Sequence, residues 1–211
     1  MLDALRTEAS SCTRCALSKT RTQVVFGNGH PHADLMFVGE APGFHEDQQG
    51  IPFVGQAGKL LDRLLAGIGL TRADVYVANT IKCRPPGNRD PLPEEKQQCE
   101  PWLFRQIGLV KPKVVATLGN HATKQLTGKE TGITRVHGQP QQAVYGSTTV
   151  TIFPLYHPAA ALYTPAMLKV LEEDFAKLPA LLEQEVEPIP SLAELVVEPE
   201  AEPVAVQLGL F

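Results

Sequence analysis

The chain has 211 residues, a net charge of −4 and 43% hydrophobic residues, which suits one soluble domain with a core and an appendage. No apolar run approaches about 18 residues and no leader pattern opens the chain, so we expect a cytoplasmic protein with no membrane partner. Seven glutamates follow Leu182, so the remainder carries a net charge of +3, which permits contact with a phosphate backbone.

In the first half of the chain, short apolar runs alternate with helical patterns. They predict strands at 35–38 and 75–78 and helices at 2–11, 56–68 and 93–109. The helix at 93–109 opens on Pro93 and two glutamates, which is typical of a first turn. Pro101 lies inside it and predicts a kink or a break.

The second half continues the alternation. It predicts strands at 114–118 and 150–153, an irregular hairpin over 133–149, and helices at 121–126 and 165–182. Strands alternating with helices indicate an α/β fold, here a single three-layer αβα domain over residues 1–181 with a mostly parallel, four-stranded central sheet. The Pro- and Glu-rich segment 182–206 lacks periodicity and is predicted to be a disordered linker.

The most specialised stretch is 39–58, which reads GEAPGFHEDQQGIPFVGQAG and joins the first strand to a helix. A loop of this kind is the usual frame of a ligand site in an open α/β sheet. The loops after the parallel strands gather at one edge of such a sheet, and they carry Glu40, Asn79 and His157. We therefore expect these three side chains to converge.

The four cysteines form two pairs, Cys12 with Cys15, and Cys83 with Cys99. In a cytosolic protein this favours a metal site over disulfides. Zinc and an iron–sulfur cluster both accept four thiolates. The wide second pair does not fit a zinc ribbon and favours a 4Fe-4S cluster; the alternative is four unrelated buried cysteines.

Several motifs together resemble the family 4 uracil-DNA glycosylases, the iron–sulfur uracil glycosylases of bacteria and archaea. They are GEAPG at 39–43, EDxxGxPFVGxAG at 46–58, KCRPP at 82–86, YHPAA at 156–160 and the four cysteines. The resemblance spans about residues 1–180. It implies a 4Fe-4S cluster on Cys12, Cys15, Cys83 and Cys99, and a monomeric, nucleoid-associated enzyme that excises uracil from DNA and leaves an abasic site for base excision repair.

Two features separate the chain from related glycosylases. It lacks the basic, His-bearing insertion of a covalently trapping relative, so we expect turnover. The best-known uracil glycosylases carry an aspartate where this chain has Ala41, so water activation by that route is closed. Glu40 is then the candidate for positioning the water or stabilising the sugar cation, and Asn88 could assist.

Three residues are candidates for holding a flipped uracil. Phe53 would stack on the base, with a core phenylalanine as the alternative. Asn79 would donate to O4 and accept from N3–H, with a turn-forming asparagine as the alternative. His157, held extended before Pro158, would donate to O2 as a neutral imidazole; the alternative is a structural histidine.

The base pocket is expected to be completed by the loop that follows Glu40. Ala41, Gly43 and Glu46 would contact the base, and Gly43 and Glu46 would exclude the methyl group of thymine. Glu46 and Asp47 could equally bind backbone amides of their own loop.

The remaining candidates contact DNA or a partner. Phosphates would meet Lys82, Arg84, Arg89, Lys124 and Arg135, or these could be solvated surface charges. Leu162, in the apolar stretch 160–162, could wedge into the vacated stack. The last residues, Gln207, Leu208, Gly209, Leu210 and Phe211, resemble the pentapeptide by which bacterial repair proteins dock on the β sliding clamp; the alternative is a frayed terminus.

Two other functional classes compete with a glycosylase. One is a non-catalytic iron–sulfur module that binds nucleic acid beside a polymerase or helicase, and the other is a redox carrier. A carrier has no use for Glu40, Asn79 and His157 at one sheet edge. Release of free uracil from an oligonucleotide separates the glycosylase from both.

Overall fold

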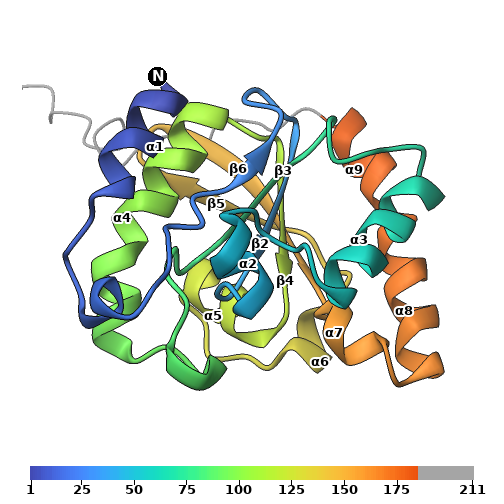
Figure 1. Cartoon of the computed structure of the whole chain (residues 1–211). Helices are drawn as coiled ribbons and strands as arrows, with labels where there is room; N and C mark the ends of the chain where they lie inside the picture. Colours follow the sequence, from blue (N-terminus) through green and yellow to red (C-terminus); the bar gives the residue numbers. More distant parts are fainter. Residues whose placement is uncertain (185–211) are drawn as a thin grey trace, which may run out of the picture.

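The computed structural model describes residues 1–184 (Figure 1). Most of the linker predicted over 182–206, from residue 185 onward, and the terminal pentapeptide lie outside the described residues. Within them, no helix has the length and apolar character needed to cross a membrane.

A six-stranded sheet forms the centre of the domain. Its strands are β1 Asn28–Gly29, β2 Leu35–Gly39, β3 Tyr76–Asn79, β4 Val114–Leu118, β5 Gln141–Tyr145 and β6 Thr148–Leu155. The order is β1-β3-β2-β4-β6-β5, in which the inner four strands are parallel and both edge strands antiparallel. The four predicted strands are therefore confirmed, but the predicted total of four is wrong.

The hydrophobic pattern predicted no strand at β1 and gave β5 only as part of the hairpin predicted over 133–149, because neither edge strand has a strand-like apolar pattern. β1 has only two residues, one of them Gly29, and β5 contains two glutamines and alternates half-buried with exposed positions. A strand that leaves one face and one edge in contact with water needs few apolar residues, so the hydrophobic pattern alone does not find it.

Helices cover both faces of the sheet. They are α1 Leu2–Ser10, α2 Phe44–Gln49, α3 Gln56–Gly67, α4 Pro93–Val110, α5 Asn120–Thr127, α6 Ile133–Val136, α7 Pro158–Ala161, α8 Pro165–Phe175 and α9 Leu178–Glu183, with short 3-10 segments at Ala16–Lys19 and Pro86–Asn88. The predicted hairpin over 133–149 is α6 followed by the β5–β6 pair.

Two proline effects differ from expectation. Helix α4 continues through Pro101 without the predicted break. Pro101 lies on the exposed face, where water can solvate the carbonyl that its missing N–H leaves free. The predicted helix at 165–182 is instead divided into α8 and α9, and Pro179 occupies the first turn of α9, where a proline is best tolerated.

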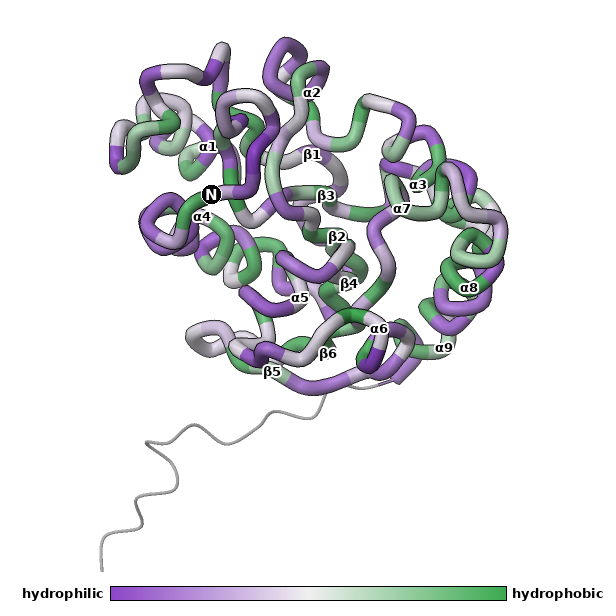
Figure 2. The backbone as a smooth tube through the Cα atoms, turned by 90° about the horizontal axis from the view of Figure 1, so that it is seen from below, coloured by the Kyte–Doolittle hydropathy of each residue, from purple (hydrophilic) through white to green (hydrophobic). Residues whose placement is uncertain are grey.

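The three predicted layers are confirmed. In Figure 1 the sheet stands between α1 and α4 on one side and α3, α8 and α9 on the other, and in Figure 2 hydrophobic strands β2 and β4 occupy the middle. Alternate residues of β2 serve the two faces: Phe37 packs with α3, α8 and α9, whereas Met36 and Val38 pack with α4 and α5. The ring of Phe37 stacks on Phe175 of α8 with a centroid separation of 5.6 Å.

The strand order defines where a ligand can bind. β3 and β4 lie on opposite sides of β2, and α3 and α4, which follow β2 and β3, cover opposite faces of the sheet. In an open α/β sheet the crevice beyond the carboxyl ends of strands at such a switch point is the usual ligand site. Gly39 pairs with Asn79 in the parallel register, so the residues that follow β2 and β3 meet at this crevice.

Candidate functional site

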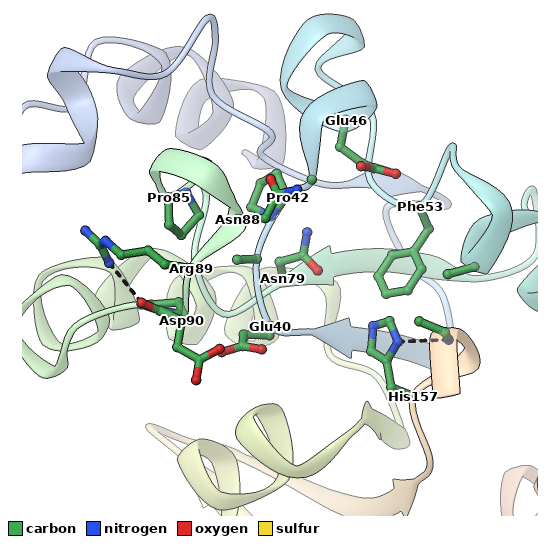
Figure 3. A pocket seen from close by; sticks show the side chains of 15 residues that line it. Glu40, Pro42, Glu46, Phe53, Asn79, Pro85, Asn88, Arg89, Asp90 and His157 are labelled. Carbon is green, nitrogen blue, oxygen red and sulfur yellow. Dashed lines mark hydrogen bonds between the residues drawn. The ribbon is translucent and has the colours of Figure 1, made fainter. Parts of the chain in front are cut away.

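The crevice is an open cavity of about 450 Å³. It is lined by Glu40, Ala41, Pro42, Gly43, Glu46, Phe53, Ala57, Asn79, Pro85, Asn88, Arg89, Asp90, Pro91, His157 and Ala159. Figure 3 shows the side chains of Glu40, Asn79, Phe53 and His157 around one space. The predicted convergence of residues from three distant strand ends is confirmed, and its cause is the shared carboxyl edge of parallel strands.

Phe53 forms one wall of this cavity in a strained backbone conformation. Its φ is +56°, a region that bulky residues rarely adopt. Arg72 supports it by donating from Nη2 to the Phe53 carbonyl at 2.8 Å, and Arg72 is itself paired with Asp62. Gly58 lies so close beneath the same carbonyl that no side chain would fit. The ring is 8% exposed and therefore belongs to both the core and the cavity wall.

Asn79 lies at the floor of the cavity, 2% exposed. Its Oδ1 atom is buried and makes no hydrogen bond within residues 1–184. A Cβ atom at Gly39 would stand 2.5 Å from that oxygen and 2.6 Å from Cζ of Phe53, so glycine is required for the amide and the ring to approach each other. A buried amide oxygen without a partner is costly and indicates a ligand atom that completes it.

His157 lies beside Phe53 at the cavity wall, with ring centroids 5.7 Å apart and planes inclined by 28° (Figure 3). Its backbone is extended before Pro158, as predicted, and it caps α7. Nδ1 accepts a hydrogen bond from the Ala159 amide at 3.1 Å, so the neutral ring carries its proton on Nε2. Burial lowers the pKa of His157 to about 4, which makes the imidazole neutral at physiological pH.

Glu40 follows β2 at the opposite end of the cavity. Burial raises the pKa of its carboxyl group, and the charge of His121 opposes that rise in part. Oε1 is buried without a hydrogen-bond partner in the described part of the chain, and Nδ1 of His121 lies 3.4 Å from it. Glu40 is therefore a carboxylate held inside the cavity with unused acceptor capacity.

The loop after Glu40 is held by its own acidic residues. Glu46 Oε1 accepts hydrogen bonds from the amides of Val54 and Gly55 at 3.0 and 3.1 Å. Asp47, 2% exposed, accepts from the Thr22 amide instead. The alternative interpretation of Glu46 as a loop-binding residue is confirmed, and Glu46 also lines the cavity.

Gly43 and Ala41 leave room beside Glu46. A Cβ atom at Gly43 would stand 2.8 Å from Oε2 of Glu46. Ala41 offers only a methyl group to the cavity, where the best-known uracil glycosylases have a carboxylate. The carboxylate of Glu46 therefore lies close to Gly43 and narrows this wall of the cavity.

The Arg- and Pro-rich loop after β3 forms the outer rim. Asn88 has a φ of +56°, and its Oδ1 accepts a 2.7 Å hydrogen bond from Arg84. Arg84 also lies over the ring of Phe44, 5.1 Å from its centroid. Arg89 pairs through two nitrogens with the carboxylate of Glu95, at 2.7 and 2.9 Å. These contacts fix the rim in place.

One predicted DNA contact is wrong. Lys82 is 2% exposed, and its ammonium donates to the carbonyl of Asn79 at 2.8 Å and to the side chain of Gln106. Gln106 in turn donates to Phe26 and Tyr76. Because Lys82 follows a buried strand end and faces the core, it binds the protein interior and cannot reach a phosphate.

The remaining predicted DNA contacts differ in exposure and partners. Lys124 of α5 pairs with Glu130 at 2.7 Å, and Arg135 of α6 is exposed. Leu162 packs partly against the core, whereas its neighbour Tyr163 is 87% exposed. Their roles toward DNA stay predictions.

The four cysteines line one small cavity between α1, α4 and the loop after β3. None is in a disulfide. Two sulfurs already receive hydrogen bonds: Cys83 from Arg21 at 3.3 Å and Cys99 from the Lys82 amide at 3.2 Å. Within residues 1–184 no three of these sulfurs lie within 4.8 Å of one another. A tetrahedral zinc ion with bonds of about 2.3 Å would hold sulfurs about 3.8 Å apart.

Three functional candidates were missed by sequence reasoning. Arg72 supports Phe53 from nineteen residues away, and His121 and Asp90 lie beside Glu40. None belongs to a motif or follows an apolar run directly. Only the placement of α5 and of the loop before α4 brings His121 and Asp90 to the cavity, so a sequence signal was lacking.

Known proteins match most of the chain. The model of the uracil DNA glycosylase superfamily matches residues 26–179. A type-4 uracil-DNA glycosylase of Sulfurisphaera tokodaii is 48% identical over 182 residues, 84% of this chain and 83% of the relative. Those of Saccharolobus solfataricus and Archaeoglobus fulgidus are 48% and 45% identical, over 84% of this chain and 84% and 91% of their own lengths. The chain belongs to the type-4 uracil-DNA glycosylases of the uracil DNA glycosylase superfamily.

Proposed function

We propose that the chain excises uracil from DNA by hydrolysis of the N-glycosidic bond and that the cavity at the carboxyl edge of the sheet is the base pocket. The observation that carries the proposal is the unpaired Oδ1 of Asn79 in a cavity that Phe53 and His157 also line. The C1′–N1 bond is out of reach inside a duplex, so the nucleotide must leave the stack and enter this cavity.

The amide of Asn79 selects the base. Oδ1 accepts a hydrogen bond from N3–H of uracil while the amide nitrogen donates to O4. Cytosine has no proton on N3 and presents a donor at C4, so both contacts fail. A buried polar atom left unpaired against the wrong base penalises binding strongly. The ring of Phe53 supports the face of the base, where stacking contributes about 1–3 kcal/mol.

His157 stabilises the leaving group. As the C1′–N1 bond breaks, its electron pair passes to uracil and negative charge grows on O2. The neutral imidazole holds a proton on Nε2 because Nδ1 accepts from Ala159, so Nε2–H can donate to O2. A preorganised donor of this kind can lower the activation free energy by about 3–4 kcal/mol when negative charge develops on an oxygen atom.

Glu40 completes the hydrolysis. Water adds to C1′ of the sugar cation, and the carboxylate of Glu40 takes its proton. Uracil leaves as its anion and takes a proton from solvent, so that the products are free uracil and an abasic site. Asn88 assists from the rim, although its Oδ1 is engaged by Arg84, so its free amide group is the part that can contact the substrate. The narrow wall at Gly43 and Glu46 excludes the methyl group of thymine.

We also propose a 4Fe-4S cluster on Cys12, Cys15, Cys83 and Cys99. Four free cysteines around one cavity, with sulfurs too widely spread for a single tetrahedral ion, support it. When bound, the cluster supplies iron–thiolate bonds that join the amino-terminal segment to the loop after β3. Iron and sulfide analysis, with absorbance near about 400 nm, tests this assignment; one zinc per chain would contradict it.

Contacts to DNA outside the pocket follow from charge. Exposed or half-exposed Arg84, Arg89, Lys124 and Arg135 are proposed to contact phosphates, and Leu162 to fill the vacated stack. Gln207, Leu208, Leu210 and Phe211 are proposed to dock on the β sliding clamp. That proposal rests on the sequence pattern, and co-elution with the clamp before and after deletion of 207–211 tests it.

The function itself is tested with an oligonucleotide that carries one labelled uracil. The purified chain should release free uracil and leave an alkali-sensitive abasic site. An oligonucleotide with thymine at the same position serves as the control and should stay intact. Binding of the uracil strand without release of the base would instead favour a non-catalytic accessory module.

A further inference from the structure

Three side chains form a chain of polar groups from the inner wall of the pocket to its rim. Glu40 follows β2, Asp90 precedes α4, and His121 lies in the first turn of α5. Oε1 of Glu40 is 3.4 Å from Nδ1 of His121, and Nε2 of His121 is 3.9 Å from Oδ2 of Asp90. The imidazole therefore presents one nitrogen to each carboxylate.

Exposure rises steadily along this chain. The side chain of Glu40 is 24% exposed, that of His121 39% and that of Asp90 80%. Glu40 and Asp90 also line the base pocket, whereas His121 stands behind them. DNA seated on the rim would cover the remaining exposed part of Glu40, and the more exposed His121 would then connect it to solvent.

The proposed reaction requires such a connection. Each turnover breaks one O–H bond of water, forms the O–C1′ bond and leaves the proton on Glu40. Before the next turnover Glu40 must lose that proton. Burial raises the pKa of Glu40, so the closed pocket retains the proton unless a neighbouring base removes it.

We propose that His121 is the relay that carries this proton out: Nδ1 takes it from Glu40 while Nε2 releases its own proton to Asp90 and solvent. The inference rests on the proposed function, because it needs Glu40 to act as the base. The carboxylate of Asp90 lies 3.9 Å from Nε2, and its negative charge favours the tautomer with the proton on Nε2, which leaves Nδ1 free to accept. His121 is thus a positioning residue and a proton carrier that never touches the base.

The charges around Glu40 determine how removal of His121 would change the pH dependence. Glu40 faces His121 of α5, Asp90 of the rim loop and Lys96 of α4. His121 and Lys96 favour the ionised carboxylate, whereas burial and Asp90 oppose it. Loss of His121 removes the positive charge that its ring carries when protonated, and without that charge the pKa of Glu40 rises further. A carboxylate base is active only when ionised, so the acidic limb of the activity profile must move to higher pH.

The test is uracil release under multiple-turnover and single-turnover conditions between pH 5 and pH 9. His121→Ala should lower steady-state turnover by up to about 10²-fold and shift the acidic limb upward, with affinity for uracil-containing DNA unchanged. Added imidazole should restore part of the rate, because the site is partly open to solvent. His121→Gln, which keeps a polar side chain without a proton carrier, should behave like His121→Ala. Asp90→Asn should show a smaller loss.

Controls separate the relay from the reaction itself. His32→Ala removes an exposed histidine before the amino end of β2 and should match the wild type. Glu40→Gln should lose activity that imidazole does not restore. Wild-type pH dependence in both His121 variants, or no rescue of His121→Ala by imidazole, would overturn the relay alone. No uracil release by the wild type would overturn the function and the relay together, and full activity of Glu40→Gln would overturn the role of Glu40.

Discussion

The proposed base pocket and the cysteine site are four residues apart along the chain, at Asn79 and Cys83, yet their buried polar atoms differ in hydrogen bonding. In the pocket, Oδ1 of Asn79 and Oε1 of Glu40 are buried without hydrogen-bond partners among the described residues. At the cysteine site, Cys83 and Cys99 already receive donors from Arg21 and the Lys82 backbone. The exception there is Nε1 of Trp102, which is also unpaired in the described structure.

This difference in hydrogen bonding indicates which of the two sites needs a bound substrate to satisfy its polar atoms. An atom left unpaired inside a protein costs about 1–3 kcal/mol, which a bound base can recover. Sulfurs that already receive hydrogen bonds from the protein are instead suited to a permanently bound group that contributes to the folded state. Substitutions at the cysteine site should therefore change the folded state, whereas substitutions in the pocket should change the chemistry and leave the fold intact.

The largest effect is expected from Cys99→Ser. Structural metal sites can contribute on the order of 10 kcal/mol to folding in small domains, and Cys99 lies 7% exposed at the end of this cavity. The variant should lose the absorbance near about 400 nm and unfold at lower denaturant than any pocket variant. If Cys99→Ser kept the wild-type absorbance and unfolding midpoint, the proposed difference between a structural cysteine site and a substrate-dependent pocket would be wrong.

His157→Ala should give the clearest loss of chemistry with an intact fold. Without a donor to O2, excision should fall by about 10²–10³-fold, while binding of uracil-containing DNA and cluster absorbance stay as in the wild type. His32→Ala is the matched control. Single-turnover kinetics and a binding assay on the same preparations provide the comparison, and a drop in binding equal to the drop in rate would contradict a role in the transition state.

Gly39→Ala tests the close approach of Asn79 and Phe53. The added methyl group would meet both side chains, at 2.5 and 2.6 Å, so one of them must move from the pocket wall. Excision should fall by about 10²-fold, since displacement of about 1 Å at a reacting centre has effects of that size. Gly67→Ala is the control, because nothing stands within 4 Å of a Cβ atom there. Equal activity of the two variants would show that the approach is dispensable.

Asn79→Asp should alter base choice more than rate. A carboxylate accepts from the exocyclic amine of cytosine but repels O4 of uracil, so discrimination should shift toward cytosine by about 10-fold or more. Asn28→Asp on the exposed edge strand is the control for the added charge. Competition between uracil and cytosine oligonucleotides measures the ratio. Undiminished preference for uracil would assign base selection to another group.

Much of the pocket geometry could be predicted from the sequence, because its main side chains directly follow the ends of buried strands. Buried apolar runs located β2, β3, β4 and β6, and the parallel edge then placed Glu40, Asn79 and His157 together. The αL conformation of Phe53 was not predictable, because it depends on Arg72 reaching its carbonyl from beyond α3. His121 was missed for a similar reason, since no pattern shows where the first turn of α5 will point.

Lys82 shows the opposite error, in which local sequence is misleading. Lysine beside Cys83 and Arg84 in a Pro-rich loop has the composition of a nucleic-acid-binding surface. Its ammonium instead meets Gln106, twenty-four residues away on α4. Burial lowers the pKa of Lys82 to about 8, which indicates how far the side chain is removed from water. Long-range pairing of this kind becomes visible only when the packing of α4 is known.

The smallest effect is expected from Lys82→Met, which keeps the length of the side chain and removes its donors. The carbonyl of Asn79 and Oε1 of Gln106 lose a partner, so the free energy of unfolding should fall by about 1–3 kcal/mol. DNA affinity and its salt dependence should not change, because a buried ammonium releases no counterion from phosphate. Lys169→Met, at a side chain 79% exposed, controls for the lost charge. If Lys82→Met alone weakened the salt dependence of DNA binding, Lys82 would belong to the DNA interface. Lower stability with unchanged DNA binding would instead show that Lys82 stabilises the fold between the pocket and the cysteine site.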